Sequence, residues 1–163
     1  MVKQLLKTRV VDPIVALLTQ GITPKKLALS VALGVVVGCF PVLGTTTTLC
    51  VLAAMAFGLN LPAIQLVNYL VYPLQILLLI PFIRLGEVMM HAHTQGLTAA
   101  VILHYARSDL RTMMSKLGLA AMHAVAGWLL VAPLAFVLIY AGVLPVVTRL
   151  AKNKAMRIGS DLE

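Results

Sequence analysis

Residues 24–48 read PKKLALSVALGVVVGCFPVLGTTTT, and this stretch decides the fold. A helix is predicted to begin at Pro24 with Thr23 as its cap, because threonine caps helix N-termini and proline suits the first helical turn. The apolar run then meets Pro41 and Gly44, which together favour a turn. The pattern therefore predicts two apolar helices joined by a tight turn.

Both predicted helices, over 27–40 and 45–59, are short. At about 1.5 Å per residue, neither reaches across a hydrocarbon core of about 30 Å. We therefore predict a helical hairpin over 24–59 that is either re-entrant or a tight pair in a thin membrane. Non-helical backbone at that depth is tolerated only where protein or a water-filled cavity covers it. The turn from Pro41 to Gly44 is thus the expected place for a site.

Composition excludes a water-soluble protein of this size. Hydrophobic residues make up 61% of the 163 positions, charged residues 11%, and the mean hydropathy is +1.00, against about 25% charged residues in ordinary soluble domains. No charged residue lies between Lys26 and Arg84, and in the stretch from Leu117 to Thr148 only His123 can become charged. The predicted fold class is all-α: a polytopic membrane protein with short proline-broken helices, re-entrant or spanning, and interfacial amphipathic helices.

The expected organisation has three parts. A cytoplasmic interfacial amphipathic helix covers 1–23, and a basic cytoplasmic tail covers 149–163. The membrane domain between them, 24–148, divides into the helical hairpin 24–59, a broken helix 62–83, interfacial helices 84–116 and a transmembrane helix 117–144.

Positive charge gathers at the two ends of the chain. The net charge is +8, and the basic residues on either side of the apolar runs suit the cytoplasmic face of a membrane and its anionic lipids. No stacking aromatic residues are interleaved with them, so nucleic acid is not an expected partner. Cytoplasmic ends imply an even number of crossings and place 84–116 outside, which mildly violates the positive-inside rule.

Four successive threonines, Thr45 to Thr48, follow Gly44 at the start of the second predicted helix. Free backbone N–H groups and the helix dipole attract anions at such a start, and broken helices of transporters hold substrates in this way. Alternatively, the hydroxyls only cap the helix and bond to preceding carbonyls. Ser30, Gly34 and Gly38 recur every fourth residue and predict close helix packing, either within the hairpin or in a homodimer.

The third apolar segment carries an internal proline, Pro73, with Asn68, Tyr72 and Gln75 around it. Polar groups in such a segment need partners, so we expect them to face inward, either toward the threonines or in simple interhelical hydrogen bonds. Arg84 follows, and it either holds a phosphate at the mouth of the site or pairs with Glu87 at i+3.

No catalytic, metal or cofactor site is predicted. The histidines lack a carboxylate or thiol at metal-site spacing, and no nucleophile, base and acid set is recognisable. The absence of a carboxylate between Lys26 and Arg84 favours passive exchange over proton coupling if transport occurs.

The runs PKKLALSVALGVVVGCFPVLGTTTT (24–48), GLNLPAIQLVNYLVYPLQ (58–75) and PFIRLG (81–86) resemble the DUF2062 family of small bacterial membrane proteins. The resemblance extends through AGWLLVAPLA at 126–135, although Tyr72 stands where many members have Asn. It implies a bacterial inner (cytoplasmic) membrane location and no settled function. The association of some members with glycosyltransferases implies glycolipid or polyprenyl-phosphate handling.

Three functions are therefore weighed. The first is a small transporter or lipid translocase for an anionic, phosphate-bearing head group held by the threonines. The second is a non-catalytic assembly subunit, for example in glycolipid or cell-envelope biosynthesis, that packs through the Ser30, Gly34 and Gly38 face. The third, a lipid-modifying membrane enzyme, lacks a convincing set of residues. Expected partners are membrane lipids, a second copy of the chain, and a glycosyltransferase or another envelope-biosynthesis protein.

Overall fold

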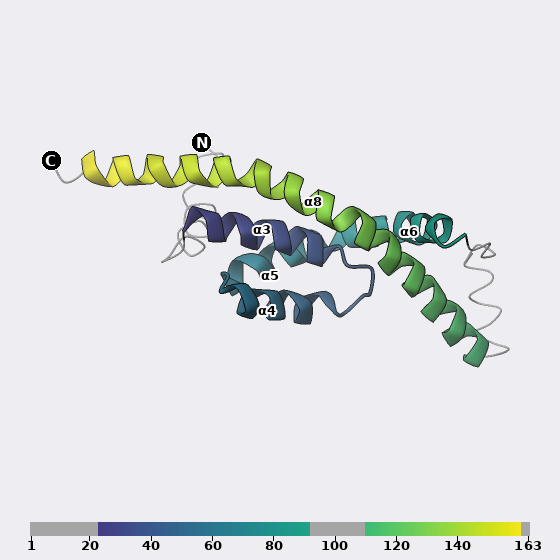
Figure 1. Ribbon diagram of the computed structural model, residues 1–163. Coiled ribbons are helices and arrows are strands. Elements are labelled where there is room, and N and C mark those ends of the chain that lie inside the picture. Colours follow the sequence, from purple (N-terminus) through teal and green to yellow (C-terminus); the bar gives the residue numbers. More distant parts are fainter. Residues whose placement is uncertain (1–22, 92–109, 161–163) are drawn as a thin grey trace, which may run out of the picture.

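The computed structural model describes residues 23–91 and 110–160, and side chains within 23–91 and 115–152. The described residues form five α-helices and no strands: α3 (Pro24–Gly38), α4 (Thr46–Phe57), α5 (Leu61–Leu70), α6 (Tyr72–Met89) and α8 (Leu110–Ser160). Helix α3 lies centrally and packs against α4, α5 and α8, while α6 packs mainly along α8 (Figure 1). The all-helical prediction is confirmed for this part of the chain.

Local sequence signals set three helix boundaries. Thr23 caps α3 as predicted, its hydroxyl accepting a hydrogen bond from the Lys26 amide at 3.4 Å. Asn60 caps α5, its side-chain oxygen accepting from the Ala63 amide at 2.9 Å. The predicted broken helix is interrupted at Val71, because Pro73 begins a new helix in its first turn.

The later helices extend beyond the predicted limits. Helix α6 continues to Met89, so Arg84 lies inside it instead of following it. Arg84 and Glu87 pair across one turn of this helix, N to O 3.5 Å, as their i,i+3 spacing predicts. Residues 110–116, which were expected in a separate interfacial helix, belong to α8. The same helix continues beyond the predicted span 117–144 as far as Ser160. The expected helix over 1–23, except for Thr23, and the part of 84–116 at 92–109 lie outside the described residues.

Among the described residues, two helices are long and apolar enough to cross a membrane: Tyr72–Met89 and the segment Ser115–Lys152 of α8. Only 17% and 6% of their most apolar windows are buried, whereas the core helix of a soluble protein would be mostly covered. Large apolar side chains such as Leu77 and Leu134 point outward. The outer surface of these helices is therefore apolar.

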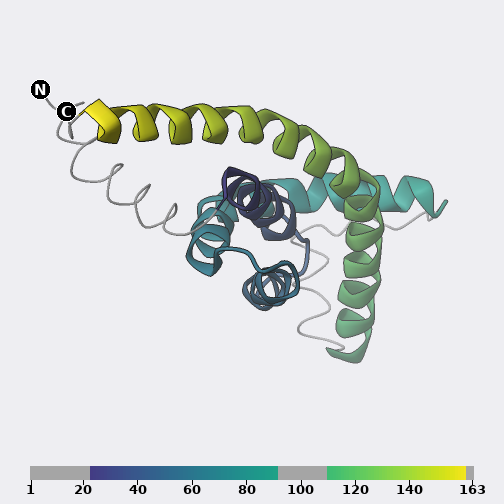
Figure 2. The ribbon, with the colours of Figure 1, turned by 60° about the vertical axis from the view of Figure 1, so that its left-hand side comes forward.

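Helix α8 is too long to be one straight span. Its apolar segment has 38 residues, or about 57 Å at 1.5 Å per residue, against a hydrocarbon core of about 30 Å. Pro133 and Pro145 each interrupt its hydrogen bonding, and Figure 2 shows that the helix bends between a part beside α6 and a part over α3.

Glycine permits the close crossing of α6 and α8. A side chain at Gly86 would collide with the backbone carbonyl of His123, and one at Gly127 would collide with the carbonyl of Phe82. The two backbones therefore touch without intervening side chains, which is typical of helix pairs in membranes.

We expect Gly86→Ala to destabilise the protein by about 1–3 kcal/mol, because the added methyl group must push two backbones apart. Gly142→Ala is the control: Gly142 lies in α8, the helix that Gly86 of α6 crosses, and nothing lies within 4 Å of a Cβ placed there, so alanine should be neutral or stabilise by up to about 1 kcal/mol. Unfolding in one detergent, followed by circular dichroism, measures both. Equal changes in stability for Gly86→Ala and Gly142→Ala would contradict the close backbone contact between α6 and α8.

Candidate functional site

The site is built on the way α3 ends. The last carbonyls of a helix lack helical partners and must be satisfied by other donors. Here the Cys39 amide donates to the Val35 carbonyl and the Phe40 amide to the Val37 carbonyl, both at 3.0 Å. The regular partner of the Val37 carbonyl would be the amide of Pro41, which has no hydrogen. The tighter bond from Phe40 replaces it and leaves the Val36 carbonyl without a helical donor.

Side chains from two other helices complete this end. The Trp128 indole Nε1 donates to the Val36 carbonyl at 3.0 Å, and the Gln75 Nε2 donates to the Phe40 carbonyl at 2.7 Å. The rings of Phe40 and Trp128 meet edge to face with centroids 5.1 Å apart. The end of α3 is therefore fixed to α6 and α8 at one point.

The turn that follows leads directly to the threonines. Pro41 is buried, whereas Leu43 and Gly44 are exposed, and Gly44 has a φ of 85° that favours glycine. The Thr45 hydroxyl donates back to the Val42 carbonyl at 2.8 Å and makes no cap with α4. The sequence left open that the threonine hydroxyls bond to preceding carbonyls, and Thr45 does so.

The start of α4 has free donors and no counter-charge. Thr46 is buried, but Thr47 and Thr48 are exposed in the first turn, which contains no acidic residue. Within the described residues, the amides of Thr46, Thr47 and Thr48 have no acceptor. The other end of α4 differs, because Lys26 Nζ donates to the carbonyl of Gly58 at 3.1 Å.

Amide side chains of α5 and α6 surround this turn. Gln65 Nε2 donates to the Thr47 carbonyl at 3.0 Å, and its Oε1 accepts from Asn68 Nδ2 at 3.2 Å. Asn68 and Gln75 are buried. The phenol of Tyr72, in contrast, faces outward with the residue 48% exposed, so the structure brings the amides toward the threonines but not the phenol.

Arg84 is separate from this group. It lies nine residues after Gln75, about 14 Å along α6. Its side chain is 66% exposed and pairs with Glu87. The geometry thus assigns Arg84 to a surface ion pair with Glu87.

The small-residue face of α3 is covered within the chain. A side chain at Gly34 would meet Val67 Cβ at 2.9 Å, and Gly38 lies against Asn68 and Val71, so this face packs on α5. The Ser30 hydroxyl donates to the Lys26 carbonyl at 2.9 Å and accepts from the Asn60 amide at 3.3 Å. These contacts leave no room there for a second chain.

Sequence reasoning missed three residues of the site. Gln65 carries a signal that could have found it, because it precedes Asn68 by three residues and so shares its helical face. Phe40 and Trp128 carried only a weak signal: they are 88 positions apart, and no local pattern joins them.

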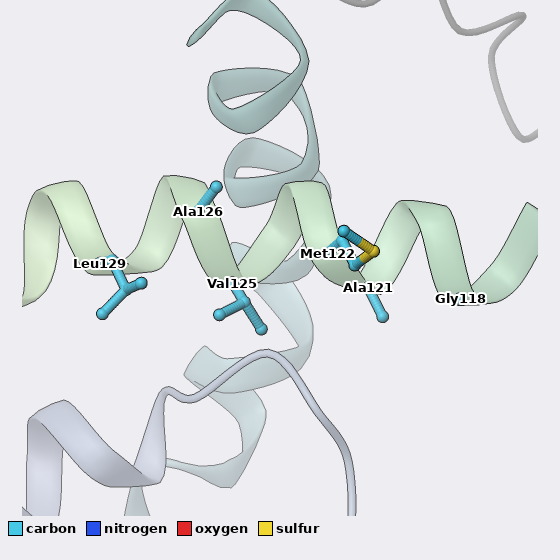
Figure 3. A pocket seen from close by; sticks show the side chains of 6 residues that line it. All are labelled: Gly118, Ala121, Met122, Val125, Ala126 and Leu129. Atoms are coloured by element: carbon cyan, nitrogen blue, oxygen red, sulfur yellow. The ribbon is translucent and has the colours of Figure 1, made fainter. Parts of the chain in front are cut away.

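A shallow apolar groove of about 390 Å³ lies along α8, and none of the threonines lines it. Figure 3 shows the residues that line it, Gly118, Ala121, Met122, Val125, Ala126 and Leu129. It offers no polar side chain to a ligand. Among the described residues, no group of three or more His, Cys, Asp or Glu side chains is placed to hold a metal ion.

Comparison with known proteins identifies a family. Residues 9–156 match the model of a family described as an uncharacterized protein conserved in bacteria, DUF2062. No curated protein and no solved structure matches the chain.

We expect Trp128→Phe to lower the free energy of unfolding by about 1–3 kcal/mol, because one hydrogen-bond donor is lost and one more buried acceptor stays unpaired. Circular dichroism must follow unfolding, since Trp128 is the only tryptophan of the chain. Leu129→Ala is the control, because Leu129 is 57% exposed and should change stability by less than about 0.5 kcal/mol. Equal stability of Trp128→Phe and the native protein would show that the bond contributes nothing.

Proposed function

The chain belongs to the DUF2062 family, and from its own site we propose that it is a small membrane transporter or translocase for a lipid with an anionic, phosphate-bearing head group. Polyprenyl phosphates are included in this class. The start of α4 binds the head group, and the lipid tail stays in the surrounding apolar phase. The proposed location is the bacterial inner membrane, with more than one crossing.

The carrying observation is the difference between the two ends of α4. A helix has partial positive charge at its start and partial negative charge at its end, each equivalent to about half an elementary charge. Lys26 compensates the end at Gly58, but no acidic group and no side-chain cap compensates the start at Thr46. Three free amides and two exposed hydroxyls there suit a phosphate group.

The surroundings of this helix start suit a lipid more than a soluble anion. Leu43, three residues before Thr46, is 52% exposed, and Leu52, four residues after Thr48, is 56% exposed, so exposed apolar side chains flank the free amides in the sequence. An amphiphilic ligand satisfies both kinds of surface at once. Helices α3 and α4 have 15 and 12 residues, about 22 and 18 Å, which supports a re-entrant hairpin with its turn at membrane depth.

The alternative, an assembly subunit, has less support. It was expected to use Ser30, Gly34 and Gly38 as its contact face, and α5 covers that face. No other described surface favours one protein partner over lipid. The lipid-binding function therefore has the stronger support.

Binding can be tested with phosphatidic acid, using diacylglycerol as the ligand with the same tails but no phosphate. We expect the native protein to retain phosphatidic acid selectively in native mass spectrometry. Thr48→Glu should weaken the binding of phosphatidic acid at least about tenfold, because the carboxylate competes for the free amides and repels the phosphate. Thr48→Gln, similar in size but neutral, should keep most of the binding.

Two outcomes would contradict this site. Equal loss in Thr48→Glu and Thr48→Gln would indicate that bulk, not charge, matters at the exposed position 48. Equal retention of phosphatidic acid and diacylglycerol would show that the head group is not recognised. Replacing Thr45 to Thr48 with valine separates the contributions, because valine removes the hydroxyls but keeps the backbone amides.

Translocation needs its own measurement. In liposomes, the native protein should speed the movement of a fluorescent phosphatidic acid between leaflets, as measured by quenching of the dye in the outer leaflet. Thr48→Glu should abolish the acceleration and Thr48→Gln should keep it. If the protein binds phosphatidic acid but does not speed its movement between leaflets, it is a lipid-binding protein and not a translocase.

A further inference from the structure

One hydrogen-bond donor is missing where α3 ends. Pro41 cannot donate to the Val37 carbonyl, so the Phe40 amide does so at 3.0 Å, and Trp128 then supplies the Val36 carbonyl. Gln75 uses its Nε2 on the Phe40 carbonyl, and its Oε1 has no partner although the residue is only 1% exposed. Buried polar groups without partners are rare and need an explanation.

A second arrangement contains the same number of hydrogen bonds. If the Phe40 amide donates to the Val36 carbonyl, as in a regular helix, α3 gains part of a turn and Trp128 Nε1 is released. The indole can then donate to the free Oε1 of Gln75. The unpaired acceptor has moved from Gln75 Oε1 to the Val37 carbonyl, and no bond has been lost overall.

The groups involved already lie at one place. Trp128 and Gln75 donate to carbonyls of the same short segment, at Val36 and Phe40. The Trp128 ring also contacts the Phe40 ring, with centroids 5.1 Å apart. In Figures 1 and 2, α8 passes beside the end of α3, where this exchange would occur.

We propose that the end of α3 is a two-state switch in which Trp128 alternates between the Val36 carbonyl and Gln75 Oε1 while the Phe40 amide alternates between the Val37 and Val36 carbonyls. The switch lengthens or shortens α3 just before the turn to Thr45, and so moves the start of α4 relative to α6 and α8. It exists because Pro41 lacks an amide hydrogen, and it does not depend on which ligand the threonines bind.

The single tryptophan makes the switch observable. The full-length protein would be labelled with 5-fluorotryptophan and studied by fluorine NMR in nanodiscs. Pro41→Ala provides the missing amide for the Val37 carbonyl, so only the state with Trp128 on Gln75 should remain. Gln75→Leu removes the alternative acceptor together with the donor to the Phe40 carbonyl, so the state with Trp128 on Gln75 cannot form. The two variants should therefore give single resonances at different chemical shifts.

The native protein should give both resonances in slow exchange, or one resonance between them in fast exchange. Pro62→Ala is the matched control: Pro62 occupies the first turn of α5, where a missing amide hydrogen is not needed, and the native spectrum should be unchanged. Should Pro41→Ala and Gln75→Leu share one chemical shift, or the native resonance coincide with that of Gln75→Leu alone, the switch is overturned. Circular dichroism of each variant verifies that it is folded.

Discussion

The carbonyl groups at the end of α3 are the constraint on which the arrangement of the other helices depends. A helix that ends inside an apolar protein leaves acceptors that water cannot reach, and each unpaired one is costly. Pro41 makes the end abrupt and removes one more donor. The Trp128 indole and the Gln75 amide supply the missing hydrogen-bond donors, and these bonds hold α8 and α6 in place relative to α3.

Small residues perform the complementary task of bringing the helices close. Gly34 and Gly38 allow α5 to lie against α3, and Gly86 and Gly127 allow α6 to cross α8. Because the interfaces use small side chains, the large ones point outward, as at Leu77 and Leu138. Such an arrangement would be unstable in water but suits a lipid environment, where close backbone packing and hydrogen bonds hold helices together.

The parts of the fold that could be predicted from the sequence are those with local causes. Thr23 with Pro24 determines the start of α3, and Pro73 determines the break before α6, because capping and proline chemistry act within one turn. The Trp128 bond to Val36 spans 92 residues, and the Gln75 bond to Phe40 spans 35. Neither has a local signature, so the polar residues were recognised as needing partners, but the partners could not be identified.

The broken hairpin also has a cost that an uninterrupted helix would avoid. A continuous helix through Phe40 and Pro41 without the proline would satisfy its own carbonyls and would not need the amide of Gln75 in an apolar interior. The break instead creates the start of α4, a helix whose C-terminal end carries a compensating lysine while its N-terminal end carries no compensating acid among the described residues. The polar side chains that support the turn and the free amides that follow it therefore have a common origin. Stabilising the break with Gln75 and Trp128 is what keeps the start of α4 available to a ligand.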